Sequence, residues 1–394
     1  MSPQFENLDN PITHMYIIGS LLTAFGIAFF IIPSIIQIAL EKNLCDQPNQ
    51  RSSHKKRTPS LGGLAVFIAL IFSIFFWTTE ISFLIKYLLC GSLIVTAIGL
   101  KDDIITLSPS RKIIGQMVAI FMLIHFADLR IDSFFGLFGI NEIPTILSYS
   151  FTILFMLTII NGFNLIDGIN GLSASAALIA ASFFGTWFYW IGLVEEALIA
   201  FALIGSLLAF LFYNITPAKI FLGDTGSLLI GLVVAILCVQ FWGHQSSGSE
   251  ITVFNSTPIV ACSVVILPLF DTVRVFFIRI AKRRSPFHPD RSHLHHMLID
   301  MGLSHMRATG VLIGVNLFFI ITACLLQGIM VEIQMLLLLG FAIGFSVLIY
   351  QFKKNYDSDM AKRLLADEYG ESEKGPIGRK RWANPLPRKQ KIRL

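Results

Sequence analysis

Apolar runs alternate along this chain with short polar gaps. We identify eleven runs, at 15–38, 61–78, 81–100, 113–127, 145–161, 171–191, 194–214, 226–243, 256–279, 308–326 and 330–351. A helix needs about 20 mostly apolar residues to cross the hydrocarbon core, and its backbone polar groups must be paired within the segment. The pattern therefore predicts an all-α integral membrane protein with eleven transmembrane helices, or ten if the short run at 113–127 does not span.

Polar residues are distributed unevenly, because every second gap is rich in Asp, Asn, His, Lys and Gly. The rich gaps contain the pair Asp102-Asp103 and the segments 161–172, 221–227 and 288–296. Alternate gaps between spanning helices lie on the same side of a membrane. The sequence therefore predicts that four separated motifs meet at one membrane face, as the parts of a membrane-embedded active site would.

Composition and charge support a membrane protein and suggest its orientation. The 394 residues are 54% hydrophobic and 14% charged, against about 25% charged in soluble domains. Lys and Arg favour cytoplasmic loops, and here they gather in the motif-bearing gaps, whereas Arg130 is the one example in the opposite gaps. With eleven spans, we expect the N-terminus outside, the C-terminus in the cytoplasm and the active site on the cytoplasmic face.

We expect two regions. Residues 1–351 form the multi-span membrane domain, and residues 352–394 form a basic, polar cytoplasmic tail without fixed structure that attracts anionic lipid headgroups. The five cysteines form no Cys-x-x-Cys pair, which disfavours a disulfide framework. Because of the apolar runs, a lipid bilayer is the expected partner. Nucleic acid is not expected as a partner, since there is no nucleic-acid-binding motif.

Two of the motifs suit a divalent cation. The adjacent acids Asp102 and Asp103 repel each other at a membrane edge, which favours a cation or proton-transfer role over two solvated capping acids. Asn161, Asn164, Asp167 and Asn170 recur every three residues and would share one helix face. Amide and carboxylate oxygens are ligands that Mg²⁺ accepts, although a plain polar helix break would also explain this spacing.

Two further motifs suit phosphate. Gly223-Asp224-Thr225-Gly226-Ser227 opens an apolar run, so its polar residues either cap a helix or bind phosphate through a metal on Asp224. The segment from Pro286 to His296 carries His, Asp and Arg. It could hold zinc or be a solvated basic loop, but Arg291 and the neighbouring basic residues fit an anionic substrate better. Lys112 could likewise hold a phosphate or simply snorkel to the interface.

Together these motifs resemble, from about residue 15 to 351, the polyprenyl-phosphate N-acetylhexosamine-1-phosphate transferases. Among these, the chain is most similar to the bacterial N-acetylglucosamine enzymes that start O-antigen, common-antigen or teichoic-acid synthesis. The resemblance implies a phosphotransferase of the bacterial inner membrane that transfers a HexNAc-1-phosphate from a UDP-sugar to undecaprenyl phosphate and releases UMP. It implies Mg²⁺ as cofactor, with Mn²⁺ as an alternative, and leaves assembly as a homodimer open.

The resemblance also assigns roles by position. Asn164 and Asp224 match metal ligands. Asp102, Asp103 and Asp167 match catalytic acids, with Asp103 as the candidate base for the lipid phosphate and Asp102 in support. The substrate-binding positions are His54, Lys55, Lys112, Asn170, His288, Arg291, His293, His295 and His296. Asn170 departs from the pattern, since most bacterial relatives carry Asp there; an amide can still hydrogen-bond uracil.

Other hypotheses remain. Intramembrane acids and broken helices are also typical of ion-coupled transporters, but the acids here are expected at one membrane face and we see no inverted repeat. A lipid-anchoring scaffold with an inactive site would not need the intact acid and metal positions. The donor could also be another UDP-amino-deoxysugar, because the loop around Arg291 differs between subgroups of the family.

Overall fold

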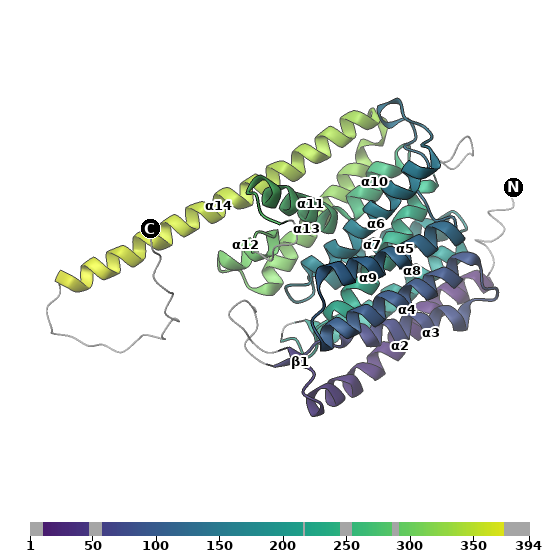
Figure 1. Cartoon of the computed structure of the whole chain (residues 1–394), viewed down its shortest axis with the longest axis horizontal. Helices are drawn as coiled ribbons and strands as arrows, with labels where there is room; N and C mark the ends of the chain where they lie inside the picture. The colour runs from purple at the N-terminus through teal and green to yellow at the C-terminus, as the bar shows by residue number, and fades with distance from the viewer. Residues whose placement is uncertain (1–10, 47–56, 216, 245–253, 286–290, 374–394) are drawn as a thin grey trace.

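The computed structural model describes residues 11–46, 57–215, 217–244, 254–285 and 291–373. These residues form a bundle of helices (Figure 1). The helices are α2 (Pro11–Glu41), α3 (Gly62–Trp77), α4 (Phe83–Ile104), α5 (Pro109–Phe126), α6 (Thr145–Ile166), α7 (Leu172–Trp190), α8 (Val194–Asn214), α9 (Gly223–Gly243), α10 (Thr257–Val264), α11 (Ile266–Ala281), α12 (Leu294–Asp300), α13 (His305–Leu325) and α14 (Val331–Glu373). Two 3₁₀ turns, η1 (Leu137–Gly139) and η2 (Leu326–Gly328), and the antiparallel pair β1 (Cys45–Asp46) and β2 (Thr58–Pro59) complete it.

Every apolar run predicted to span the membrane is helical, which confirms a helical, multi-span membrane protein. Within the described ranges, eight helices are long and apolar enough to cross a membrane, or nine if the bent pair α10–α11 forms one span. Helix α3 has only 16 residues, and α5 carries Arg111 and Lys112 in its first turn, which shortens its apolar part. The total of eleven spans, and which end lies outside, stay predictions.

Helix α9 lies at the centre of the bundle and packs against α3, α4, α6 and α7. Its apolar stretch is 89% buried, whereas that of α14, at the edge, is 22% buried. The peripheral helices instead expose large apolar side chains such as Phe30 and Ile146. In water such a surface would aggregate, but against lipid tails it is the expected exterior. The start of α9, which carries Asp224, therefore belongs to a helix that its neighbours hold firmly in place.

The predicted span at 256–279 is broken into α10 and α11, which meet at Val265 with a bend of 81°. Pro268 has no backbone N–H, so it cannot pair with the carbonyl of Val264 four residues earlier. Asn316 of α13, a fully buried residue, donates its amide Nδ2 to that carbonyl at 3.2 Å. A third helix thus pairs the carbonyl that the proline leaves free, and α11 is set at an angle to α10.

Helix α14 continues beyond the bundle as a long projection (Figure 1). The expectation that the tail from residue 352 has no fixed structure is therefore wrong for 352–373, which extend the same helix. Met360, Ala361 and Lys362 are good helix formers, and the first proline of the tail, Pro376, follows the helix end. Residues 374–394 lie outside the described part of the chain.

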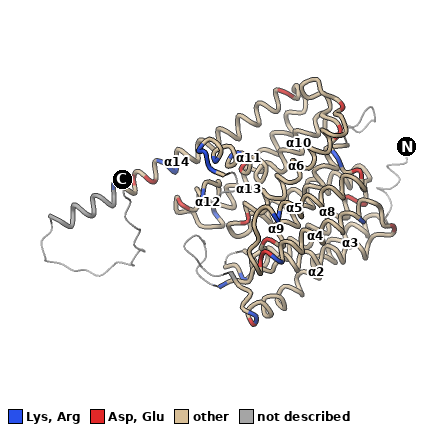
Figure 2. Tube along the Cα trace, in the orientation of Figure 1, with Lys and Arg blue, Asp and Glu red and all other residues tan. Residues whose placement is uncertain are grey.

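Lys and Arg gather at one end of the bundle, where α4 and α11 finish and α5 and α9 begin (Figure 2). This is the end that carries the motifs, as the charge distribution along the sequence predicted. Strand β2 also reaches this end, because Phe221, just before α9, donates its N–H to the carbonyl of Pro59 at 2.7 Å. The first motif-bearing gap and the Gly-Asp-Thr-Gly-Ser segment are therefore neighbours.

Candidate active site

Asp103, at the end of α4, caps the start of α9. Its carboxylate accepts hydrogen bonds from the N–H of Asp224 (2.8 Å), the N–H of Thr225 (3.0 Å) and the hydroxyl of Thr225 (2.6 Å). Leu222, the N-cap residue of α9, makes no side-chain cap bond, so a carboxylate from another helix takes that role. Both oxygens of Asp103 are thereby engaged with the first turn of α9, and α4 and α9 are joined at the site.

Gly223 makes this arrangement sterically feasible. Its φ is +72°, in the left-handed region that favours glycine. A Cβ at this position would lie 2.1 Å from the carbonyl oxygen of Ser60 and 2.7 Å from Oδ2 of Asp103. The chain can therefore turn into α9 directly beneath the Asp103 carboxylate only if residue 223 has no side chain.

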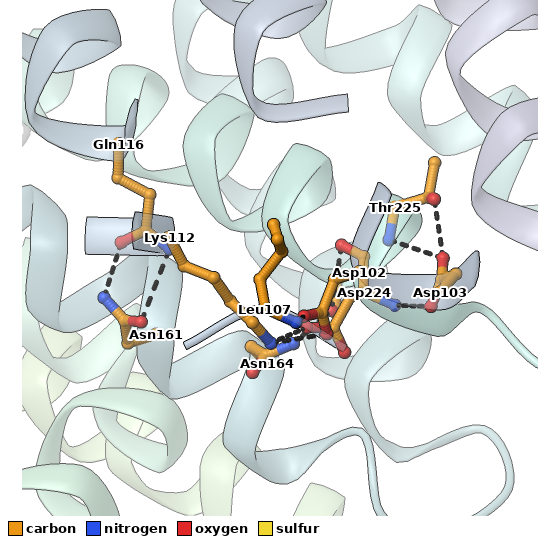
Figure 3. A network of polar contacts seen from close by, with 10 residues as sticks. Asp102, Asp103, Leu107, Lys112, Gln116, Asn161, Asn164, Asp224 and Thr225 are labelled. Atoms are coloured by element: carbon orange, nitrogen blue, oxygen red, sulfur yellow. Dashed lines mark hydrogen bonds and ion pairs between the residues drawn. The ribbon is translucent and has the colours of Figure 1, made fainter. Parts of the chain in front are cut away.

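Lys112 lies between two other carboxylates (Figure 3). Its Nζ is 2.7 Å from Oδ2 of Asp102 and also contacts Oδ2 of Asp224. Asp102 accepts a further bond from the N–H of Leu107 at 2.6 Å. The three charged side chains are each about a quarter exposed or less, so water screens them only partly. Two carboxylates share one ammonium here, which leaves a net negative charge at the end of the bundle.

Asn164 of α6 is linked to the same group. Its Nδ2 donates to the hydroxyl of Ser227 at 2.9 Å, and that hydroxyl lies 3.4 Å from the carbonyl of Asp224. One turn earlier, Asn161 donates its Nδ2 to Oε1 of the fully buried Gln116 at 2.8 Å. This amide pair fixes α6 against α5, one turn from Lys112. The two predicted metal ligands, Asn164 and Asp224, therefore lie close to Lys112.

Asp167 and Asn170 lie in the turn between α6 and α7. Loss of water around Asp167, with the neighbouring carboxylates of Asp224 and Asp103, raises the pKa of Asp167 well above its ordinary value. The Asn170 side-chain oxygen is 3.2 Å from Nδ1 of His305, and its carbonyl accepts from the hydroxyl of Thr309 at 2.9 Å. Asn170 is therefore joined to the start of α13.

His293 is the N-cap residue of α12, and His295 and His296 lie in its first turn. His293 precedes the helix, and its Nδ1 is 2.9 Å from Oδ2 of Asp271 in α11. Burial lowers the pKa of His295 to about 3 and that of His296 to about 4, so both imidazoles are neutral near pH 7. Arg291 donates to Oδ1 of Asp300 at 2.8 Å.

The predicted site residues thus fall into two groups. Asp102, Asp103, Lys112, Asn164 and Asp224 lie together. The second group is Arg291, His293, His295 and His296, at the start of α12. His295 packs against Gly168, which follows Asp167, so this contact connects the second group to the turn between α6 and α7. His54, Lys55 and His288 lie outside the described residues.

Several residues at the site escaped the sequence analysis. Thr225 anchors Asp103, and the buried Asn214 accepts from the N–H of Gly171 (2.7 Å) while donating to the carbonyl of Ile220 (2.8 Å), which ties the two central motifs together. Asp271 and Arg274 also belong to this group, and they lie inside the apolar run at 256–279. A signal was present, because two opposite charges three residues apart in a spanning segment indicate a buried ion pair.

The site can be tested for its fit to a magnesium ion. Among the described residues no three His, Cys, Asp or Glu side chains gather as a metal-binding group. Magnesium usually binds one or two carboxylates together with waters and substrate phosphates. Asp102 and Asp224 converge on one cation, Lys112, and the amide of Asn164 is adjacent through Ser227. These hard oxygen donors fit Mg²⁺ bound jointly by protein and substrate, and do not form a complete protein cage.

The fold and the site define a multi-span membrane protein with a carboxylate-rich site at one end of its bundle. Residues 85–242 match the family described as glycosyl transferase family 4. The chain is 34% identical over 313 residues (79% of this chain and 84% of the relative) to a "Probable undecaprenyl-phosphate N-acetylglucosaminyl 1-phosphate transferase" of Bacillus subtilis. It is 29% identical over 289 residues (72% and 76%) to an "Undecaprenyl-phosphate alpha-N-acetylglucosaminyl 1-phosphate transferase" of Yersinia pestis.

A further relative is the "Decaprenyl-phosphate N-acetylglucosaminephosphotransferase" of Mycobacterium leprae, 29% identical over 322 residues, which are 75% of this chain and 80% of the relative. The chain belongs to glycosyl transferase family 4, and it is a membrane-bound phosphotransferase. The family and the enzyme class predicted from the motifs are confirmed.

Proposed function

We propose that the protein transfers N-acetylglucosamine 1-phosphate from UDP-N-acetylglucosamine to undecaprenyl phosphate and releases UMP. The observation that carries the proposal is the convergence of Asp102, Lys112 and Asp224 at the end of the bundle where basic residues gather. Similarity over most of the chain to three transferases whose names specify an N-acetylglucosamine phosphate and a polyprenyl phosphate supports it.

In the proposed reaction, an oxygen of the lipid phosphate attacks the β-phosphorus of the UDP-sugar. A new phosphorus–oxygen bond forms while the bond from the β-phosphorus to the bridging oxygen breaks. UMP leaves with that oxygen, and a lipid-linked sugar diphosphate remains. Such phosphoryl transfer depends mainly on positioning and on stabilising charge. Bound Mg²⁺ would neutralise the diphosphate oxygens and make the leaving UMP a better leaving group.

The protein's own residues divide the remaining tasks. Asp224 and Asn164 would hold the metal, with Asp102 next to them. Lys112 would donate to a diphosphate oxygen once substrate competes with the carboxylates for its ammonium. Asp103 stays a candidate base, but three hydrogen bonds to α9 already occupy its oxygens, which favours a role in holding Asp224 in place.

We further propose that the site faces the cytoplasm of a bacterial inner membrane, where UDP-sugars are made, and that the product starts a cell-envelope polysaccharide. Excess Lys and Arg at the site end of the bundle supports this side, because positive residues are retained in the cytoplasm. A UDP-HexNAc other than UDP-N-acetylglucosamine is the competing donor, and a screen of donors decides between them.

The proposal is tested by UMP release from purified protein with undecaprenyl phosphate, Mg²⁺ and each of several UDP-HexNAc donors. We expect UDP-N-acetylglucosamine to give the fastest release. Asp224→Asn keeps the side-chain shape and removes the charge, so we expect kcat to fall by about 10²–10³, as when one preorganised electrostatic group is lost. Asp128→Asn is the matched control, since this exposed acid pairs with Arg130 beyond the far end of α5. Equal activity of both variants would refute the role of Asp224.

A further inference from the structure

Asp271 is a buried acid in α11 that the proposed chemistry does not use. The residue is 2% exposed, and an isolated carboxylate in such a place would be very costly. It is compensated by Nη2 of Arg274 at 2.6 Å, Nδ1 of His293 at 2.9 Å and the N–H of Leu294 at 3.3 Å. Three donors from two segments therefore converge on this one side chain.

Asp271 and Arg274 together hydrogen-bond to the residues that lead into α12. Besides its bond to Asp271, Nη2 of Arg274 donates to the carbonyl of Ser292 at 2.6 Å. Residues 292, 293 and 294 are thus each bonded to the same turn of α11. Because Pro268 and Asn316 set the angle of α11, the position of the histidine segment follows from the break between α10 and α11.

The contact with Asp271 determines which nitrogen of His293 carries the proton. An ionised carboxylate can only accept hydrogen bonds, so Nδ1 of His293 must be the protonated nitrogen. Nε2 is then left to face another partner. The His293 side chain is 4% exposed, and Nε2 has no hydrogen-bond partner among the described residues. Both ring nitrogens of the neighbouring His295 are likewise unpaired among the described residues. Buried polar atoms are nearly always paired in folded proteins, so these imidazoles are available to hydrogen-bond a ligand.

The surroundings of His293 place it close to the site. Its ring stacks on His295, with centroids 5.9 Å apart and an interplanar angle of 19°. His295 in turn packs against Gly168, whose added Cβ would lie 2.5 Å from Nε2 of His295. Gly168 directly follows Asp167, so a single imidazole separates His293 from the Asp-Gly-Ile-Asn-Gly segment.

We propose that Asp271 is a positioning residue that holds His293 with Nδ1–H towards α11 and Nε2 towards the bound UDP-sugar, where Nε2 accepts a hydrogen bond from a hydroxyl of the sugar. The inference rests on the proposed function and adds a residue to it. The competing view is that Asp271 only pins α12 to α11, in which case the function of Nε2 is irrelevant.

Two substitutions of His293 separate these views. Asn places an amide near the position of Nδ1, so His293→Asn keeps the bond to Asp271 and loses Nε2. Gln places its amide near the position of Nε2, so His293→Gln does the reverse. We expect His293→Asn to keep the melting temperature of the wild type and to lose about 10- to 100-fold in kcat/KM, the range typical of losing a group that orients or completes a site. His293→Gln should retain more activity than His293→Asn.

A double-mutant cycle then tests Asp271 itself. Asp271→Asn should lower kcat/KM by about 10- to 100-fold, and the double variant Asp271→Asn/His293→Asn should be no less active than His293→Asn alone, because Asp271 acts through Nε2. Multiplying losses in the double variant would overturn the proposal. If Asp271→Asn fails to fold, the His293 pair still decides, since wild-type activity of His293→Asn overturns it too.

Failure of this inference is distinct from failure of the proposed function. Wild-type protein that releases no UMP with any UDP-HexNAc refutes the proposed function and this inference with it. Wild-type protein that releases UMP, together with fully active His293→Asn, refutes only the role given to Asp271 and His293.

Discussion

Replacing Asp103 by Asn distinguishes a positioning acid from a catalytic base. The carboxylate accepts three hydrogen bonds from Asp224 and Thr225, and an amide offers only one acceptor oxygen. At least one charge-assisted bond is lost, which costs about 1.5–3 kcal/mol and corresponds to about 10- to 150-fold in activity. Because these bonds hold the residue proposed to bind Mg²⁺, we expect the loss to appear as a higher Mg²⁺ requirement.

The assay is a Mg²⁺ titration of UMP release at saturating lipid and UDP-sugar. Asp103→Asn should lose activity mainly at low Mg²⁺ and recover much of it when Mg²⁺ is saturating. Thr225→Val is the matched variant, because it removes only the hydroxyl donor and should shift the titration in the same direction by less. Loss of a general base costs about 10²–10⁴ in rate. A loss of about 10³ that Mg²⁺ does not relieve, with Thr225→Val behaving as wild type, would refute the positioning role.

Three further perturbations test the packing around the site. Gly168→Ala places a Cβ 2.5 Å from buried His295 and should lower the free energy of unfolding by about 1–3 kcal/mol, with a lower melting temperature and a lower kcat/KM. Gly26→Ala, whose Cβ would have nothing within 4 Å, is the control, and equal effects of the two substitutions would contradict this prediction. Asn316→Ala should lower thermal stability by about 1–3 kcal/mol by leaving the Val264 carbonyl unpaired; an unchanged melting curve would contradict this. Burial lowers the pKa of His295 to about 3, whereas the exposed imidazole has a pKa of about 6.5. The packing of α12 should therefore be fully stable above pH 6.5 and lose stability as the pH falls towards 3. Equal protection of the α12 amides from hydrogen exchange at pH 7 and pH 5, after correction for intrinsic rates, would refute this.

The helices and the grouping of the motifs could be predicted because each depends on local pattern. Long apolar runs must be helical in lipid, and charge parity brings alternate gaps to one end. These two local patterns predict that Asp102, Lys112, Asn164 and Asp224 lie at the same end of the bundle.

Features that depend on partners distant in sequence were not predictable. The bend at Val265 depends on Asn316, about 50 residues later, and the cap on α9 depends on Asp103, which lies on α4. The pair Asp102-Asp103 looks equivalent in sequence, yet one acid faces Lys112 and the other faces α9. The helical continuation of α14 to Glu373 was missed because polar composition suggested a tail without fixed structure, although its residues favour helix.

The most direct measurement of the central claim is UMP release from the purified full chain in lipid nanodiscs. Undecaprenyl phosphate, UDP-N-acetylglucosamine and Mg²⁺ are supplied together, and each is then omitted in turn. The account predicts UMP and a lipid-linked N-acetylglucosamine diphosphate in equal amounts, only when all three are present, and almost none from Asp224→Asn. UMP release without the lipid phosphate, or none from the complete mixture with any UDP-HexNAc, would contradict it.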